Sequence, residues 1–206
     1  PTAFKCGGSV QPCELNVDEV NEAAENGTAA HRCLESLATK GAVDWERIDD
    51  VCDELDGDSE EVRYLCSKAT KLWAKLRDTF PCALTEIAVS YELPSLEVAG
   101  LQLTGHIDAI SIVGNQVRIL DWKTGRLDAN YSHQMKAYLA MVLLAYPDLE
   151  GGTATIAWVR SGDVENYTMT RQDALKWVHD FEERVIGWDG VYRTGDHCVH
   201  CRRKHE

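Results

Sequence analysis

Long apolar segments and repeated or low-complexity stretches are missing from this chain of 206 residues. No hydrophobic run approaches the roughly 20 residues that a membrane-spanning helix needs, so we expect no membrane contact. Residues 1–10 lack the long apolar core of a secretory leader, and we therefore expect no signal peptide. With 44% hydrophobic residues, the composition is that of one globular domain with a sizeable core.

Positive charge is also scarce, since 21 Lys and Arg against 34 Asp and Glu give a net charge of −13. That balance argues against a nucleic-acid-binding protein, but the charge is unevenly spread. Residues 1–100 carry 20 acids and 9 bases, whereas residues 101–206 carry 14 acids and 12 bases. The excess is concentrated in residues 44–61, which hold ten acids and Arg47 as their only base. This run is either a solvated helical face or an acidic cover that keeps DNA away from one surface, and the second half leaves room for a local basic track.

Hydrophobic periodicity predicts helices, then three strands, a helix, two strands and a last helix. This order indicates an α/β layer arrangement, with α and β segments around a mixed sheet and a helical N-terminal region. The expected helices cover residues 17 to the late thirties, with an interruption near 27–28, then 45–55, 60–80 and 131–146, and the last begins at Thr170 or Asp173. The expected strands cover residues 83–93, 101–113, 116–122, 153–159 and 165–169.

A two-residue hairpin turn is predicted at Gly114-Asn115, between two runs rich in β-branched residues. With these two residues as the loop, Val113 faces Gln116, and the numbers of facing residues sum to 229. The register of the hairpin follows from this turn alone.

The register places Asp108 opposite Asp121 and His106 opposite Lys123, and alternation along the strands puts all four on one face. The other members of that face are apolar: Ile110, Ile112, Val117 and Ile119. Directly opposed side chains lie roughly 4.5–5.5 Å apart, and like charges there repel. A shared Mg²⁺ or Mn²⁺ ion is the simplest reason for two such carboxylates, and Lys123 can reach a phosphate oxygen. The alternative is a surface hairpin with solvated aspartates.

The sequence leaves both a structural and a functional role open for several residues. His31 lies on a predicted helix and is ordinarily a packed or surface histidine. Gln134 and Tyr138 share one helix face because they are four residues apart. Three aromatic residues could stack on bases, although core packing is their commoner use: Trp122, Tyr131 and Trp158.

Eight cysteines favour metal binding or buried thiols over disulfides in a chain of this kind. Four of them are expected to be small core residues: Cys33, Cys52, Cys66 and Cys82. Cys198-x-x-Cys201 has the spacing of metal ligands, the alternative being a reduced and empty pair.

The ordered set of motifs resembles the PD-(D/E)XK nuclease superfamily. The motifs are GTAAH, GHID, DWKTG and the Gln134/Tyr138 pair, with KCGGS upstream and GDHCVHC downstream. They are most similar to the RecB-like exonuclease branch, which includes the iron–sulfur CRISPR-adaptation nucleases and related phage proteins. The resemblance implies a restriction-endonuclease-like core in a single domain over 1–206, with a helical part at about 17–80 and a cysteine-containing tail at about 195–206.

The resemblance also implies roles for individual residues. Asp108, Asp121 and Lys123 would be catalytic, and Lys123 would position the attacking water and stabilise charge on the phosphate. The implied metal ligands are His31, Asp108, Asp121 and the main-chain carbonyl of Trp122. Gln134 and Tyr138 would orient Lys123 or hold the DNA backbone. Glu86 is either an outer acidic residue of the site or a surface charge.

For the cysteines, the resemblance implies that Cys6, Cys198 and Cys201 bind a 4Fe–4S cluster, which needs four ligands in its usual form. The candidates for the fourth ligand are Cys13, His200 and His205. A Cys₃His zinc site is the alternative.

These readings together predict a Mg²⁺- or Mn²⁺-dependent DNA exonuclease, and the resemblance implies that it belongs to a bacterial cell or a phage-infected host. It would be cytoplasmic and serve DNA repair or recombination, with DNA and a helicase or recombinase as partners. The alternatives are a DNA-end-binding or recombination-accessory module with little catalysis, and a structural metal-binding domain.

Overall fold

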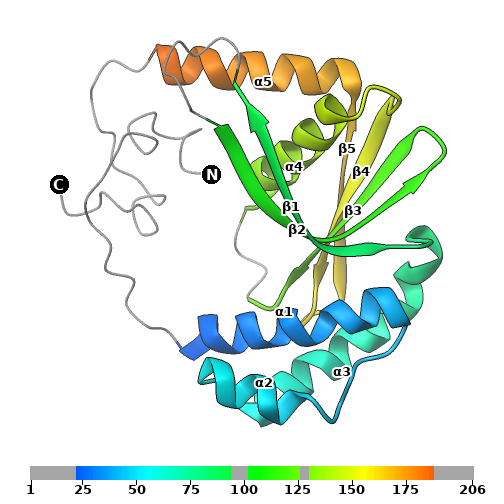
Figure 1. Cartoon of the computed structure of the whole chain (residues 1–206), viewed down its shortest axis with the longest axis vertical. Coiled ribbons are helices and arrows are strands. Elements are labelled where there is room, and N and C mark those ends of the chain that lie inside the picture. The colour runs from blue at the N-terminus through cyan, green and yellow to red at the C-terminus, as the bar shows by residue number, and fades with distance from the viewer. Residues whose placement is uncertain (1–21, 94–101, 126–129, 188–206) are drawn as a thin grey trace.

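The computed structural model describes residues 22–93, 102–125 and 130–187. These residues form an α+β fold around one mixed sheet with strand order β1-β2-β3-β4-β5, in which β3 and β4 are parallel and the other neighbours antiparallel. The elements are α1 (Glu22–Lys40), α2 (Ile48–Leu55), α3 (Ser59–Leu76), the 3₁₀ turn η3 (Arg77–Thr79), β1 (Leu84–Glu92), β2 (Gln102–Val113), β3 (Gln116–Lys123), α4 (Ser132–Ala145), β4 (Gly151–Trp158), β5 (Asp163–Thr170) and α5 (Arg171–Ile186). In Figure 1, α4 and α5 lie on one side of the sheet and α1, α2 and α3 on the other.

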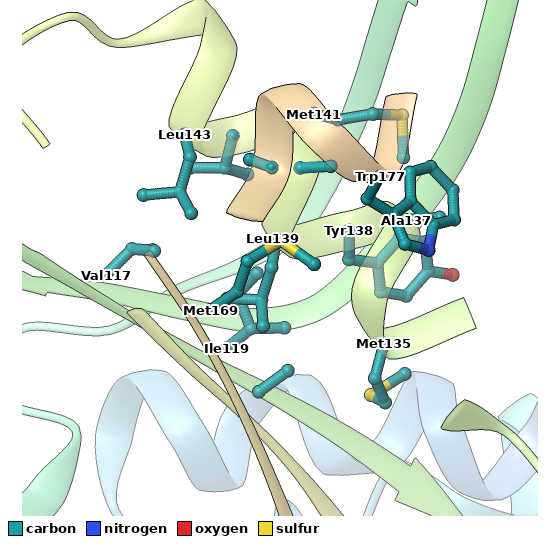
Figure 2. Packing of buried hydrophobic residues seen from close by; sticks show 14 of the residues in the cluster. Val117, Ile119, Met135, Ala137, Tyr138, Leu139, Met141, Leu143, Met169 and Trp177 are labelled. Carbon is teal, nitrogen blue, oxygen red and sulfur yellow. The ribbon is translucent and has the colours of Figure 1, made fainter. Parts of the chain in front are cut away.

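Helix α4 makes the crossover between the parallel strands β3 and β4, and it is apolar on nearly all sides. Eight of its residues are buried: Met135, Ala137, Tyr138, Leu139, Ala140, Met141, Val142 and Leu143. They pack between the sheet and α5, as Figure 2 shows. No helix in the described part of the chain is both long and apolar enough to cross a membrane, and α4 has only 14 residues.

Helices α1, α2 and α3 form a second core against the opposite face of the sheet. Trp73 of α3 meets Trp122 of β3, with ring centroids 6.2 Å apart. Three of the four cysteines expected in the core, Cys33, Cys52 and Cys66, are buried in this layer, which confirms their reading as packing residues. The expectation for Cys82 is wrong: it is exposed, and its positive φ of 53° places it in the turn before β1.

Most of the predicted elements are present, with four differences. Helix α1 runs without interruption through Gly27, because the buried face on either side holds the helix together against the intrinsic cost of a glycine. Helix α2 begins at Ile48 rather than at residue 45, and α3 ends at Leu76 before the η3 turn. Ile112, expected on an apolar face, is 53% exposed near the tip of the hairpin.

Candidate active site

The hairpin register is as predicted from the turn, but the paired region stops short of the aspartates. Val113 pairs with Gln116, and the ladder continues to Ala109 and Leu120. Beyond that pair β2 and β3 separate. Asp108 therefore lies where the two strands diverge, at the end of a regular ladder.

The Asp108 carboxylate occupies the fork between the strands. Its Oδ2 accepts a hydrogen bond from the Trp122 backbone N–H at 2.6 Å, which satisfies a donor that the ladder no longer pairs. Its Oδ1 lies 3.2 Å from His31 Nδ1 on α1. One carboxylate thus connects β3 with the helical layer.

Strand alternation reverses at Asp108 and at its neighbour across the sheet, Glu86. Ile107 and Ile110 both face the α4 core although they are three residues apart. Glu86 has a φ of 51°, and the β1–β2 pairing skips this residue and Asp108. An irregularity of this kind re-aims side chains beside functional sites.

The reversal corrects one sequence prediction, that His106 lies opposite Lys123 on the aspartate face. His106 pairs with Ala88 of β1 and is exposed. Its neighbour Gly105 faces the Tyr138 ring, so alternation turns the His106 side chain to the opposite side of the sheet. The shared face of four residues is therefore wrong for His106.

Lys123 is held between a carboxylate and an aromatic ring. Its Nζ lies 2.6 Å from Asp121 Oδ2 and 4.4 Å from the centroid of the Tyr131 ring. The Tyr131 ring in turn packs on Trp158, with centroids 5.7 Å apart. Asp121 is only 2% exposed, so the ion pair is largely shielded from solvent. The ammonium group therefore has a defined position between Asp121 and Tyr131.

Burial and neighbouring charges shift the pKa values of Asp121, His31 and Glu86. Burial, and then the charge of Asp108, raise the pKa of Asp121 to about 6 despite the nearby Lys123 ammonium. Burial opposes protonation of His31, but its hydrogen bond to Asp108 and the charges of Asp108 and Asp121 raise its pKa overall. Glu86 is exposed, yet partial desolvation and the charge of Asp108 raise its pKa. The site carries more negative charge than its own cations balance.

Gln134 and Tyr138 lie on α4 as the helical spacing predicts. Gln134 Nε2 donates to the Tyr138 hydroxyl at 2.9 Å. Burial, and then the charge of Asp121, raise the pKa of Tyr138 to about 12, so its hydroxyl stays protonated. Gly105 lies directly beneath the ring, and a Cβ there would stand 2.4 Å from Tyr138 Cε1. That these two residues act on Lys123 or on DNA stays a prediction.

A divalent cation fits the donors that converge here. Asp121 Oδ2 is buried, and no hydrogen bond of regular geometry reaches it in the described part of the chain, although Lys123 lies close. Carboxylate oxygens of this kind are the preferred ligands of Mg²⁺ and Mn²⁺. Residues 22–93, 102–125 and 130–187 contain no preformed group of three His, Cys, Asp or Glu side chains at ligand distances. The arrangement therefore consists of two acids and one histidine that lie near one another without forming a complete set of metal ligands.

The other predicted residues fall into two groups. Trp122 and Trp158 are 2% and 1% exposed, so they serve packing rather than base stacking. The six residues of the cluster hypothesis lie outside the described residues: Cys6, Cys13, Cys198, His200, Cys201 and His205. The contact of Tyr131 with Lys123, and a contact of Arg160 described below, were not foreseen, since both depend on a neighbouring strand or loop.

The chain is similar in fold to two proteins of known structure, and it matches the model of one protein family. A "putative exonuclease" from Eubacterium rectale is 15% identical, with a TM-score of 0.48 over 93% of this chain and 77% of that one. The crystal structure of SSO0001 is 18% identical, with a TM-score of 0.40 over 92% of this chain and 87% of that one. None of the curated proteins compared with this chain matches it. The family model of the PD-(D/E)XK nuclease superfamily matches residues 10–205, and the chain belongs to that superfamily.

Proposed function

We propose that this nuclease is a Mg²⁺- or Mn²⁺-dependent deoxyribonuclease that acts at DNA ends or on single strands. The observation that carries the proposal is the meeting of Asp108, Asp121 and Lys123 where β2 and β3 separate, with His31 beside them. The similarity of the motifs to RecB-like exonucleases favours ends and single strands over internal sites in duplex DNA.

The residues that would hold the cation are Asp108, Asp121 and His31, with the Trp122 main-chain carbonyl as a further expected ligand. Two carboxylates beside one lysine favour a doubly charged ion there, and the charge of Asp108 contributes, after burial, to the raised pKa of Asp121. When bound, the ion supplies Lewis-acid activation of water and neutralises phosphate charge.

The chain's own groups would do the remaining work. The Lys123 ammonium would donate to a phosphate oxygen as charge develops there, and its fixed position between Asp121 and Tyr131 lowers the cost of reorganisation. The Tyr138 hydroxyl, protonated and oriented by Gln134, is a neutral hydrogen-bonding group for Lys123 or for the DNA backbone.

The acidic run of residues 44–61 would keep DNA away from the α2 side. Nine of its ten acids are exposed, so the run is a solvated face. The exception is Glu61, which is partly buried. A face of this charge repels phosphates and favours approach from elsewhere on the molecule.

Cleavage of labelled DNA tests this proposal. Single- and double-stranded oligonucleotides labelled at the 5′ or 3′ end are incubated with and without Mn²⁺, with the wild-type protein and with Asp108→Ala. Metal-dependent shortening by the wild-type protein alone is expected. Binding without cleavage would favour the end-binding module, and neither binding nor cleavage would favour a structural domain.

We also propose that Cys6, Cys198 and Cys201 share a 4Fe–4S cluster, or Zn²⁺ in its place. A cluster would bring the two ends of the chain together. Visible absorbance of the purified protein, together with iron and zinc analysis, separates the two metals. Absence of both from protein purified without oxygen would contradict the proposal.

A further inference from the structure

Arg160, which follows β4, holds the backbone directly after Lys123. The neighbouring Val159 N–H donates to the Lys123 carbonyl at 2.9 Å. Arg160 Nε donates to the next carbonyl, that of Thr124, at 2.6 Å. Two successive residues after β4 thus fix two successive carbonyls at the end of β3, the second through a side chain.

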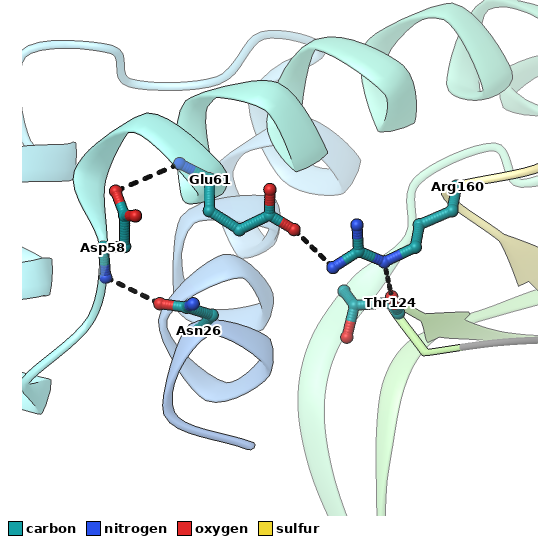
Figure 3. Close-up of polar contacts among 5 residues, drawn as sticks. All are labelled: Asn26, Asp58, Glu61, Thr124 and Arg160. Carbon is teal, nitrogen blue, oxygen red and sulfur yellow. Dashed lines mark hydrogen bonds and ion pairs between the residues drawn. The ribbon is translucent and has the colours of Figure 1, made fainter. Parts of the chain in front are cut away.

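The same guanidinium group reaches the helical layer. Its Nη2 forms an ion pair with Glu61 in the first turn of α3 (Figure 3). Glu61 is the one acid of the 44–61 run that is not exposed, so its burial is explained by this partner. A planar guanidinium can serve two acceptors at once in fixed directions, which an ammonium group at the end of a flexible chain cannot.

The helix that Arg160 contacts is itself tied to α1. Asp58 caps α3 by accepting from the Glu60 and Glu61 backbone N–H groups, and its own N–H donates to Asn26 Oδ1 of α1 at 2.6 Å. Figure 3 shows these contacts in one row from Asn26 to Thr124. Asn26 is buried and lies five residues before His31 on the same helix. The row therefore links the strand end that carries Lys123 to the helix that carries His31.

Close packing supports the same junction. A Cβ added at Gly27 of α1 would lie 3.1 Å from Thr124 Oγ1, so the start of α1 rests against the residue whose carbonyl Arg160 holds. The spacing between α1 and the end of β3 is thereby set from two directions.

We propose that Arg160 is a positioning residue, which fixes the Lys123-Thr124 backbone against α3 and so sets Lys123 and His31 at one distance from each other. The inference rests on the proposed nuclease function, because positioning matters only if Lys123 and His31 serve one reaction. It assigns Arg160 no contact with DNA, although 42% of its side chain is exposed.

The kinetic test compares Arg160→Ala, Arg160→Lys and Glu61→Gln with Arg77→Ala as the control. Arg77 lies just past the end of α3, is 66% exposed and faces Asp78 at 3.8 Å. We expect Arg160→Ala to lower kcat between about 10- and 100-fold with little change in KM, as displaced catalytic groups do. Arg160→Lys and Glu61→Gln should fall between Arg160→Ala and the wild type, and Arg77→Ala should match the wild type.

A direct phosphate contact would give a different pattern. In that case KM rises, kcat is kept, and the salt dependence of binding weakens by about one phosphate contact. That result would overturn the positioning role.

Hydrogen exchange without DNA or metal separates this inference from the nuclease proposal. Amides in a peptide spanning residues 119–125 should exchange faster in Arg160→Ala than in the wild type or in Arg77→Ala. If the wild-type protein cleaves no DNA, the proposed function fails while this measurement still reports on the junction. Equal exchange in all three proteins would overturn the inference.

Discussion

The two faces of the sheet hold their helices by different means. On the α4 and α5 face, a continuous apolar core fills the space, and α4 is buried along most of its length. On the α1–α3 face, the apolar core reaches Trp122 and Val159 beside the candidate site, and polar contacts join it there, among them His31 to Asp108 and Arg160 to Glu61. Apolar packing depends little on pH, whereas contacts between charged groups change with pH and are screened by salt.

This difference runs through the candidate active site itself. Asp121 is 2% exposed and lies with Lys123 and Tyr131. The His31 side chain is 28% exposed, and its position depends on one carboxylate. The sheet thus supplies a half of the site that is fixed by burial, and the helical layer supplies a half that is held by polar contacts. Variants in the fixed half and in the polar half should therefore fail in different ways.

The largest effect is expected from Lys123→Ala, which removes the cation of the fixed half. Cleavage should fall by at least about 10²–10³-fold, the usual loss when a transition-state donor is removed. The fold should persist, since α4 and its core are untouched. Rates are measured under single-turnover conditions, and Lys176→Ala on α5, 72% exposed, is the matched control. Wild-type cleavage by Lys123→Ala would remove this residue from the mechanism.

Asp121→Asn should make the metal-free protein more stable relative to the wild type as the pH rises from 4 to 7. The pKa of Asp121 is raised from 3.8 to about 6. Below pH 4 the folded and unfolded states both hold the proton, and no cost arises. Between pH 4 and 6 the unfolded state loses its proton first, so the wild type loses stability as the pH rises.

Each unit of the pKa difference between the folded and unfolded states is worth about 1.4 kcal/mol. The free energy of unfolding of Asp121→Asn should therefore exceed that of the wild type by about 2–3 kcal/mol at pH 7. Urea unfolding in EDTA at several pH values measures it. Asp180→Asn on α5 is the control, because the lowered pKa of this exposed carboxyl gives the opposite sign. A stability difference independent of pH would contradict the burial argument for Asp121.

Gly105→Ala probes the packing between the sheet and α4, because the added Cβ would lie 2.4 Å from the Tyr138 ring. Overpacking of this kind costs about 1–3 kcal/mol. We expect a lower midpoint of urea unfolding and a reduced cleavage rate, since the Tyr138 hydroxyl must move. Thr104→Ala, at an exposed position next to it, should change neither quantity. Full stability and activity of Gly105→Ala would mean that the ring has room to shift.

The smallest effect is expected at Tyr131, whose ring faces the Lys123 ammonium at 4.4 Å. A cation–π contact is worth about 0.5–2 kcal/mol. Tyr131→Leu should therefore lower the cleavage rate about 2- to 30-fold, while Tyr131→Phe, which keeps the ring, should stay close to the wild type. Equal losses in both variants would point to the hydroxyl group instead.

Short-range sequence patterns predicted the features that depend on residues close together in the chain, such as turns and helix starts. The Gly114-Asn115 turn gives the hairpin register because a two-residue loop leaves no other pairing. The capping box of Thr170 and Asp173 starts α5 at one of the two predicted positions. The register also predicted that Asp108 and Asp121 lie near each other, since both residues lie just past the regular ladder.

What the sequence did not predict depends on contacts between distant segments. The reversal at Glu86 and Asp108 arises across two strands, and no residue type marks it, because neither position is a glycine. Arg160 is 99 residues from its partner Glu61, and nothing near either residue signals the pair. The continuity of α1 through Gly27 likewise reflects burial against other elements, which outweighs helix propensity.

Mn²⁺ binding tests the central claim most directly, because it asks whether the two aspartates act together. Electron paramagnetic resonance follows free Mn²⁺ during titration of the wild type, Asp108→Asn, Asp121→Asn and the control Asp180→Asn. We expect Asp108→Asn and Asp121→Asn each to weaken binding at least tenfold, and Asp180→Asn to bind as the wild type does. Equal Mn²⁺ affinity in all four proteins would contradict a shared cation between Asp108 and Asp121.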